Sequence, residues 1–198
     1  MPNRTGRKRV GVLALQGDFE AHQKALERAG AHAIQVRTAP ELENLDGLII
    51  PGGESTTILK LINLMDLKEP LRRLVNEKPI FGTCAGAILL AKDVLNPPQE
   101  SFGAVDITVE RNAYGRQIES RVVQIEPTAE FQRRAGAGDM EAVFIRAPII
   151  RRTGPGVRIL AQYDGDPVLV EQGKHLVATF HPELTDDARV HKLFLSKL

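Results

Sequence analysis

Short apolar runs alternate with segments of helical period through the first half of this chain, and this alternation limits the fold more than any other feature. Four runs are short and bounded by turn residues: 10–15, 34–36, 47–50 and 79–83. One helix is predicted after the first run, with Phe19, His22, Leu26 and Ala29 on one face and Gly30 at its end. Another is predicted between the last two runs, with a single stripe of Ile58, Leu61, Ile62 and Met65. Strands joined by crossover helices produce this pattern, so a mostly parallel sheet is expected.

The pattern changes after Ala91, where strand-like runs follow one another with little helix between them. These runs cover residues 107–111, 117–125, 142–146, 157–162, 168–172 and 175–180. An antiparallel or mixed arrangement is therefore predicted for the second half, followed by a helix over 186–197 that carries Val190, Leu193 and Phe194. Loops rich in proline or glycine at 96–99, 134–139 and 153–156 are too short to separate domains.

One domain over residues 10–198 is thus expected behind a basic, flexible tail over residues 1–9, which holds Arg4, Arg7, Lys8 and Arg9. The 26 lysines and arginines nearly balance the 25 aspartates and glutamates, so no strong field favours nucleic acid. A single cysteine excludes an internal disulfide and sites with several cysteine ligands, and no metal is expected. Since no apolar run approaches the ~20 residues of a membrane span, we expect no membrane contact and a cytoplasmic location.

That single cysteine, Cys84, lies in the sequence Gly-Thr-Cys-Ala-Gly, directly after an apolar run and before a helix-forming one. Small residues on both sides of a nucleophile permit the sharp strand-to-helix turn that exposes it. The partial positive charge of a helix N-terminus also favours a thiolate. The alternative is an inert cysteine in a core strand, but the flanking glycines favour a nucleophile.

A thiolate nucleophile needs a base that can also protonate the leaving group, and histidine suits both roles near neutral pH. His181 ends an apolar run and is followed by Pro182 and Glu183. Residues two apart in an extended segment project to the same side, so Glu183 can orient the imidazole. The other histidines, at positions 22, 32, 175 and 191, are interpreted as surface or packing residues.

A Gly-Gly pair, Gly52 and Gly53, follows the run that ends at Ile50 and precedes a predicted helix. Such a pair lets backbone N–H groups turn toward an oxyanion, and Ser55 or Thr56 can cap the helix. We assign the oxyanion hole to the N–H groups of Gly53 and Ala85. A plain turn and a phosphate-binding loop remain alternatives, but neither a Walker lysine nor a G-x-G-x-x-G motif is present.

Six segments together resemble the glutaminase subunit of pyridoxal 5′-phosphate synthase, a triad (class I) glutamine amidotransferase. They are VLALQG (12–17), PGGESTT (51–57), FGTCAG (81–86), VERN (109–112), FIRAP (144–148) and FHPEL (180–184). The cysteine, histidine and Gly-Gly motifs are typical of the broader amidotransferase class. The GESTT, ERN and IRAP sequences narrow the resemblance to vitamin B6 biosynthesis.

The resemblance implies a flavodoxin-like three-layer α/β/α sandwich and hydrolysis of L-glutamine to glutamate and ammonia through a thioester on Cys84. It implies that glutamine is held at six positions: Gly53, Glu54, Ser55, Arg111, Ile145 and Arg146. Because glutamine carries a carboxylate and an ammonium, Arg111 and Glu54 are suitable clamps for these groups. Without the family motif, Arg111 and Arg146 would be interpreted as surface arginines.

The resemblance also implies a partner, because nothing in this chain is equipped to use the ammonia. The implied acceptor is a (β/α)₈-barrel synthase subunit in a dodecameric core that carries up to twelve glutaminases. It combines ammonia with ribose 5-phosphate and glyceraldehyde 3-phosphate, so pyridoxal 5′-phosphate is a product of the complex and no cofactor is expected here. Two alternatives stay open at this point: an amidotransferase subunit for another acceptor, such as imidazole glycerol phosphate synthesis, and a non-catalytic binding subunit.

Overall fold

The main sheet of the protein has seven strands in the part of the chain that the computed structural model describes, residues 6–112 and 120–198. Their spatial order is β10-β11-β12-β4-β3-β1-β2. The bounds are β1 Arg9–Leu13, β2 His32–Val36, β3 Gly47–Ile50, β4 Ile80–Thr83, β10 Arg158–Tyr163, β11 Asp166–Gln172 and β12 His175–Ala178. The strands from β12 to β2 in this order pair in parallel, while β11 and β10 add an antiparallel edge.

The parallel register brings three strand ends to one edge of the sheet. Ile50 of β3 lies beside Gly82 of β4, and Ala178 of β12 lies beside Thr83. Ligand sites of open α/β sheets lie outside the carboxyl ends of such strands. The segments that leave β3, β4 and β12 here are those that contain Gly52, Cys84 and His181.

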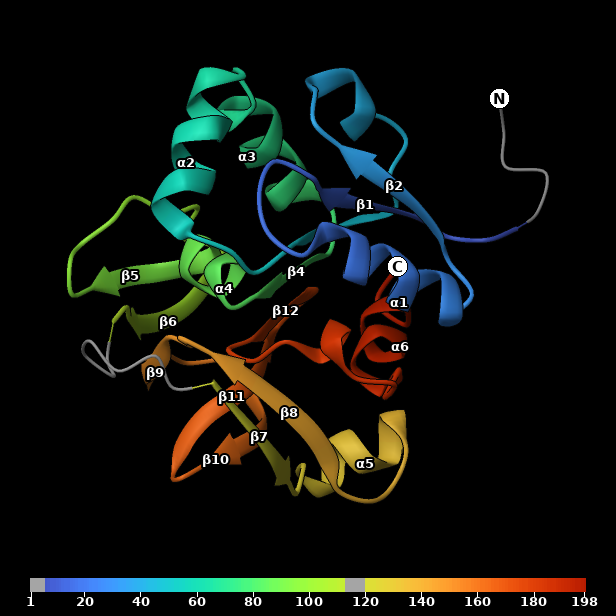
Figure 1. Cartoon of the computed structure of the whole chain (residues 1–198), viewed down its shortest axis with the longest axis vertical. Coiled ribbons are helices and arrows are strands. Elements are labelled where there is room, and N and C mark those ends of the chain that lie inside the picture. The colour runs from blue at the N-terminus through green and yellow to red at the C-terminus, as the bar shows by residue number, and fades with distance from the viewer. Residues whose placement is uncertain (1–5, 113–119) are drawn as a thin grey trace.

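Helices cover both faces of this sheet, so the chain forms three layers (Figure 1). On one face, Leu48 and Ile50 of β3 pack in a hydrophobic cluster with α2 (Ser55–Leu64), α3 (Lys68–Glu77) and α4 (Ala85–Leu90). On the other face, Ile49 and Phe81 pack in a cluster with α1 (Phe19–Arg28), α5 (Ala129–Ala135) and α6 (Arg189–Leu195). Neighbouring residues of β3 thus face opposite layers, as strand geometry requires. The predicted α/β class with mostly parallel strands is confirmed.

Two smaller sheets and two short 3₁₀ helices complete the structure. Strands β5 (Ala91–Leu95), β6 (Val105–Glu110) and β9 (Ile149–Thr153) form one sheet, and the antiparallel pair β7 (Ser120–Ile125) and β8 (Met140–Ile145) forms the other. The 3₁₀ helices are η1 (Ala39–Leu42) and η2 (Pro182–Leu184). Because β5 pairs with β6 in parallel and β9 pairs with β6 in the antiparallel sense, the prediction of a mixed second half is confirmed.

Several sequence-based boundaries differ from the structure. The single helix predicted between β3 and β4 is two helices, separated at Asp66, whose φ is +54°. Met65 was placed on the buried stripe but is 39% exposed, because it follows the last turn of α2. Helix α5 and strands β5 and β9 were not predicted, and α5 includes Arg134, which was assigned to a loop.

The N-terminal boundary also differs, because β1 begins at Arg9. The Arg9 N–H donates to Asp46 Oδ2 at 2.8 Å, and Lys8 Nζ donates to the Leu198 carbonyl at 2.6 Å. The first five residues of the predicted tail, with Arg4, lie outside the described residues, as do residues 117–119 of the run predicted over 117–125.

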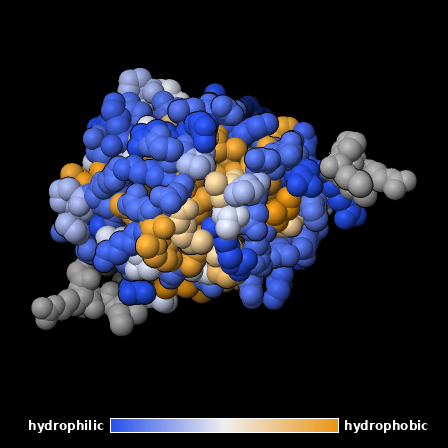
Figure 2. Space-filling view, turned by 90° about the horizontal axis from the view of Figure 1, so that it is seen from above, coloured by the Kyte–Doolittle hydropathy of each residue, from blue (hydrophilic) through white to orange (hydrophobic). Residues whose placement is uncertain are grey.

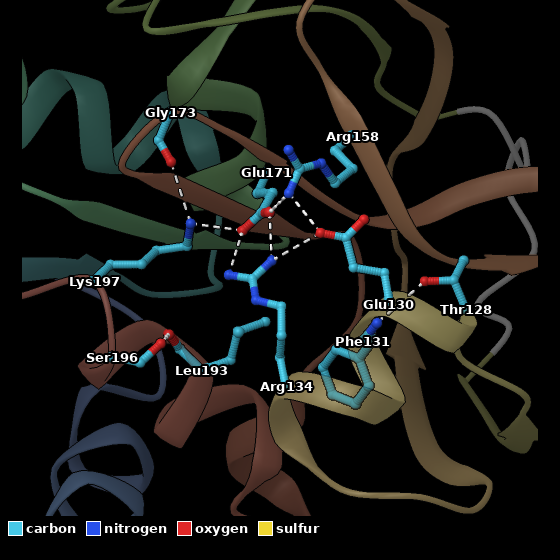
Figure 3. Close-up of polar contacts among 10 residues, drawn as sticks. All are labelled: Thr128, Glu130, Phe131, Arg134, Arg158, Glu171, Gly173, Leu193, Ser196 and Lys197. Atoms are coloured by element: carbon cyan, nitrogen blue, oxygen red, sulfur yellow. Dashed lines mark hydrogen bonds and ion pairs between the residues drawn. The ribbon is translucent and has the colours of Figure 1, made fainter.

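A network of ion pairs joins the second half of the chain to its C-terminal end (Figure 3). At its centre is Glu171 of β11, which is 5% exposed. Arg134 of α5 donates to its Oε1 at 2.6 Å, and Lys197 lies 2.5 Å from its Oε2. Burial alone raises the pKa of Glu171, but hydrogen bonds from Arg134 and Lys197 outweigh it and the pKa is lowered. The network ties α5 and the C-terminal end to the edge of the main sheet.

The surface seen from above in Figure 2 is mainly hydrophilic, with apolar residues in smaller areas. Within the described ranges, no helix combines the length and apolar character needed to span a bilayer.

Candidate active site

Cys84 occupies a strained turn between β4 and α4. Its backbone has φ +48° and ψ −102°, a conformation that a non-glycine residue adopts only when its surroundings hold it there. The Cys84 N–H donates to the Ala178 carbonyl of β12 at 2.9 Å, which is one such restraint. A Cβ on Gly86 would lie 2.0 Å from the Ile50 carbonyl oxygen, so α4 can approach β3 this closely only with glycine there. The local sequence therefore builds the turn that was predicted from it.

His181 and Glu183 leave the neighbouring strand β12 and are held together. The Nδ1 atom of His181 lies 2.7 Å from Glu183 Oε1, and both residues are 4% exposed. The His181 N–H donates to the Val143 carbonyl of β8 at 2.8 Å, and η2 turns Glu183 back toward the ring. The structure has the predicted pairing of His181 with Glu183, but a 3₁₀ turn brings the two side chains together in place of the extended segment that was expected.

Cys84 and His181 line the same pocket, and both approach Gly52, so their side chains lie close enough to interact. Burial alone would lower the pKa of His181, but hydrogen bonds with Cys84 and Glu183 and the charges of both groups raise it to about 10. Burial likewise raises the pKa of Glu183, but the attraction of His22 and the hydrogen bond with His181 outweigh it and lower the pKa. The Sγ atom also lies 3.9 Å from the Ile145 carbonyl oxygen, at the long end for a thiol donor. Cys84 and Glu183 thus both favour the charged form of the His181 imidazole.

The Gly-Gly pair approaches the cysteine and the histidine closely. A Cβ on Gly52 would lie 2.3 Å from His181 Cε1 and 3.3 Å from the Cys84 Cβ. Gly53 has φ +153°, and a Cβ there would lie 2.4 Å from the side-chain oxygen of Gln16. The same Gln16 oxygen accepts a hydrogen bond from the Glu54 N–H at 2.7 Å. Gln16 belongs to one of the family motifs but had no predicted role, and the structure places it against this loop.

A pocket of about 360 Å³ opens in front of Cys84 and His181. Pockets for small ligands are typically about 300–1,000 Å³. Its lining includes all six positions predicted to hold glutamine: Gly53, Glu54, Ser55, Arg111, Ile145 and Arg146. Glu183 lies behind His181 and does not line the pocket, and neither does Ala85.

Glu54 is the N-cap of α2, whereas Ser55 or Thr56 was predicted to cap this helix. Its carboxylate accepts hydrogen bonds from the N–H groups of Thr56 at 3.2 Å and Thr57 at 2.7 Å. Burial raises its pKa, but bonds from the side chains and N–H groups of Thr56 and Thr57 outweigh this and lower it to about 2. The prediction failed because α2 begins at Ser55, so the cap position falls on Glu54, whose carboxylate binds the N–H groups two and three residues further on.

Arg111 lies against the same carboxylate. Its Nη2 atom is 3.6 Å from Glu54 Oε1, and the residue is 8% exposed. The Nε atom is buried, and no acceptor among the described residues reaches it. A buried guanidinium donor without an acceptor costs stability, so this atom is available to a ligand that carries one.

Among the described residues, one group of potential metal ligands lies in this site. Asp18, His181 and Glu183 each have a ligand atom within 4.8 Å of the others. The Nδ1–Oε1 hydrogen bond already accounts for the approach of His181 and Glu183. The arrangement therefore needs no cation to explain it.

His22, interpreted from the sequence as a surface or packing residue, is fully buried behind Glu183. Its Nε2 atom lies 3.0 Å from Thr83 Oγ1 and 3.3 Å from Glu183 Oε2. Its position on the apolar face of the predicted helix indicated burial, but no local pattern linked it to a glutamate 161 positions later.

The fold and this geometry define a class: α/β proteins in which a cysteine at a strand-to-helix turn meets a histidine–carboxylate pair beside a small-ligand pocket. Comparison with known proteins gives the family. Residues 12–198 match the SNO glutamine amidotransferase family, and the chain belongs to that family.

Relatives and solved structures agree with this assignment. The pyridoxal 5′-phosphate synthase subunit PdxT of Solibacter usitatus is 65% identical, over 96% of this chain and 100% of that protein. PdxT of Thermus thermophilus is 53% identical, over 94% of this chain and 95% of that protein. A crystal structure of a glutamine amidotransferase superposes with a TM-score of 0.85 at 49% identity, covering 95% of this chain and 97% of the other. A chain in the structure of PurLQS from Thermotoga maritima has a TM-score of 0.69 at 16% identity, with 96% of this chain and 98% of the other covered, and shows the shared fold alone.

Proposed function

We propose that this chain is the glutaminase subunit of a pyridoxal 5′-phosphate synthase, and that it hydrolyses L-glutamine to L-glutamate and ammonia. One observation carries the proposal: Cys84, His181 and Glu183 come together from two strand ends at a pocket of a size suited to an amino acid. The names of the relatives, synthase subunits for pyridoxal 5′-phosphate, support this acceptor over imidazole glycerol phosphate synthesis.

In the proposed reaction, the Cys84 thiolate attacks the side-chain amide carbon of glutamine. The carbonyl oxygen becomes an oxyanion, for which we propose the N–H groups of Gly53 and Ala85 as donors. His181 is held at Nδ1 by Glu183, and we propose that its other ring nitrogen, Nε2, donates a proton to the amide nitrogen as the C–N bond breaks. Ammonia leaves and a thioester on Cys84 remains. His181 then takes a proton from water, which attacks the thioester; the C–S bond breaks, glutamate leaves, and the Cys84 thiolate and the His181 imidazolium are restored.

Arg111 is the proposed partner of the substrate carboxylate, because its buried Nε lacks an acceptor in the described structure. Glu54 is proposed to attract the substrate ammonium from its capping position. Its low pKa, about 2, keeps it charged, although burial alone would raise this value and the bonds to Thr56 and Thr57 lower it. The remaining proposed contacts are Gly53, Ser55, Ile145 and Arg146, which line the same pocket.

A synthase subunit is proposed as the partner, in the form of a (β/α)₈ barrel within a dodecameric core. Free ammonia is mostly protonated in neutral water and then no longer acts as a nucleophile, so transfer by a sheltered route is required. We further propose that docking activates the glutaminase by ordering the loop at Gly52 and Gly53. That loop is held by the side chain of Gln16 and by contact with His181, so a small movement there reaches the reacting groups.

The test is to mix this chain with a barrel synthase subunit, ribose 5-phosphate, glyceraldehyde 3-phosphate and glutamine. We expect glutamate release together with the absorbance of pyridoxal 5′-phosphate, and much slower glutamate release without the barrel. Glutamate without the pyridoxal product would indicate another acceptor. No glutamate under any condition would contradict the glutaminase activity, and equal rates with and without the barrel would contradict activation by docking.

Replacement of Gly52 by alanine should disable the site without unfolding the chain. The added methyl group would lie 2.3 Å from His181 Cε1, so the imidazole must shift. Since a displacement of about 1 Å can lower the rate about 100-fold, we expect glutamate release by the assembled complex to fall about 100-fold. Gly165→Ala is the control for a loss of stability alone, because a Cβ there meets nothing within 4 Å and the change costs only the strain of a side chain at φ +84°. A Gly52→Ala complex with the turnover of wild type would show that His181 need not occupy its present position.

A further inference from the structure

We propose that His22 is a positioning residue for the proposed reaction: it donates a hydrogen bond to the outer oxygen of Glu183 and so holds the carboxylate in register with His181. The inference rests on the proposed function, because it gives a role to the second oxygen of Glu183, the carboxylate whose first oxygen orients the His181 imidazole. The contacts behind Glu183 carry it, since they join α1 to the residues at the end of β12.

The two oxygens of Glu183 face different histidines. Oε1 lies 2.7 Å from His181 Nδ1, and Oε2 lies 3.3 Å from His22 Nε2. Glu183 is 4% exposed, and its Oε2 makes no hydrogen bond of standard geometry in the described parts of the chain, so the 3.3 Å approach of His22 Nε2 is a longer polar contact. A buried carboxylate oxygen without a donor costs about 1–3 kcal/mol or more. The N–H of His22 is therefore the group that can satisfy it.

The neighbours of His22 decide which ring nitrogen carries its proton. Burial, the largest influence, lowers the pKa of His22, so the ring is neutral near pH 7 and has one N–H. With the proton on Nδ1, the lone pair of Nε2 would point at Glu183 Oε2, which is repulsive and leaves that oxygen unsatisfied. With the proton on Nε2, the N–H is shared between Glu183 Oε2 and Thr83 Oγ1, which lies 3.0 Å away. We assign the Nε2 proton on this basis.

His191 of α6 completes the arrangement on the other side of His22. Its Nε2 lies 3.1 Å from His22 Nδ1, and the residue is fully buried. Burial lowers the pKa of His191 to about 3, so it is neutral and donates from Nε2 to the lone pair on His22 Nδ1. The His191 Nδ1 atom then carries only a lone pair, which agrees with its having no partner within the described residues. The His191 N–H thus fixes the proton of His22 on Nε2, the ring nitrogen that faces Thr83 and Glu183.

The charged groups around this chain of contacts are few. Asp18 and His181 act on His22 besides Glu183, and Arg28 and Asp187 act on His191 besides His22 and Glu183. Among the ion pairs of the described residues, the partner of Glu183 Oε2 is His22, at 3.3 Å, and neither Arg28 nor another cation takes that place.

The test replaces His22 with glutamine, asparagine and leucine in the full chain assembled with its synthase. The amide nitrogen of glutamine can occupy the place of His22 Nε2, whereas that of asparagine falls nearer to the place of Nδ1. We expect His22→Leu and His22→Asn to lower kcat about 10–100-fold with KM within about twofold, and His22→Gln to restore most of it. Loss of the donor also raises the pKa of Glu183, so the acid limb of kcat should move to higher pH in the two deficient variants.

A second measurement needs neither glutamine nor partner. The ¹³C resonance of the Glu183 carboxyl, assigned by its loss in Glu183→Gln, should titrate at higher pH in His22→Asn than in wild type and His22→Gln. His175→Gln is the control, because it replaces another buried histidine at the opposite end of β12 and should leave both readouts unchanged.

The outcomes separate the two proposals. Wild-type kcat and an unmoved acid limb in His22→Asn and His22→Leu would overturn the role of His22. So would equal losses in all three variants with equally lowered melting temperatures, because the role would then be packing alone. If wild type released no glutamate but the Glu183 carboxyl still titrated higher in His22→Asn, the proposed function would fail while the contact would stand.

Discussion

Replacement of Cys84 by alanine should abolish glutamate release by the assembled complex. Without the sulfur no thioester can form, and neither His181 nor the oxyanion donors have a nucleophile to assist. Removal of the nucleophile of a comparable triad costs about 10⁶-fold in kcat, and we expect a loss of at least about 10⁴-fold here, limited by background hydrolysis. The measurement is glutamate formed per subunit in the presence of the synthase, with ammonia supplied separately to show that the synthase itself remains active.

This experiment has an internal control in the composition of the chain. Cys84 is the single cysteine, so iodoacetamide can modify no other thiol in this subunit. Modified wild type should match Cys84→Ala, and Cys84→Ala should be indifferent to the reagent. Glutamate release by Cys84→Ala at the wild-type rate would mean that another group attacks glutamine, or that the activity comes from a contaminant.

The parallel strands could be predicted because burial on both faces leaves an uninterrupted apolar run. Gly47–Ile50 is fully buried, and it matches the predicted run residue for residue. The short helix α5 shows the opposite case. Its seven residues bury only Phe131, and the Thr128 side chain caps it by accepting from the Phe131 N–H at 3.4 Å. One buried residue in two turns leaves no periodic pattern, so the segment could not be recognised as a helix.

The candidate site was predictable where its geometry is local. The glycines beside Cys84 and the spacing of His181 and Glu183 are properties of a few adjacent residues, and the structure has the turn and the hydrogen bond that these imply. Arg111, Ile145 and Arg146 came from the family resemblance alone, and they line the pocket. Their roles toward glutamine remain predictions.

Contacts between distant segments could not be predicted from one sequence. His22 and Glu183 belong to different elements, and their contact follows from the packing of α1 on the sheet beside β12. The same holds for Lys197 with Glu171 and for Gln16 with the N–H of Glu54. In each case the local sequence could indicate only whether a residue is buried. Its hydrogen-bond or ion-pair partner depends on how distant segments pack in the fold.

Replacement of Glu183 by glutamine should leave the fold intact and lower kcat about 10³–10⁴-fold, as loss of the carboxylate does in comparable triads. Both oxygens of a carboxylate accept hydrogen bonds, and here one faces His181 and the other faces His22. An amide accepts on one side only. If its oxygen faces His181, its NH₂ group opposes the N–H of His22. If the amide oxygen faces His22, the NH₂ group donates to His181 Nδ1, and the proton of the neutral imidazole must then lie on Nε2. In that state Nε2 cannot accept a proton from the nucleophile.

The pH dependence should distinguish this loss of charge from misfolding. Burial lowers the pKa of His181, and Cys84 and Glu183 together raise it to about 10, so in the free wild-type enzyme the imidazolium persists up to about that pH. Without the Glu183 charge the His181 pKa must fall, so the alkaline limb of the residual activity should move to lower pH. Glu130→Gln, in the ion-pair network of α5, is the control and should keep the wild-type profile. If Glu183→Gln kept the wild-type turnover and alkaline limb, Glu183 would have no part in the reaction, and the histidines behind it would be left with a purely structural role.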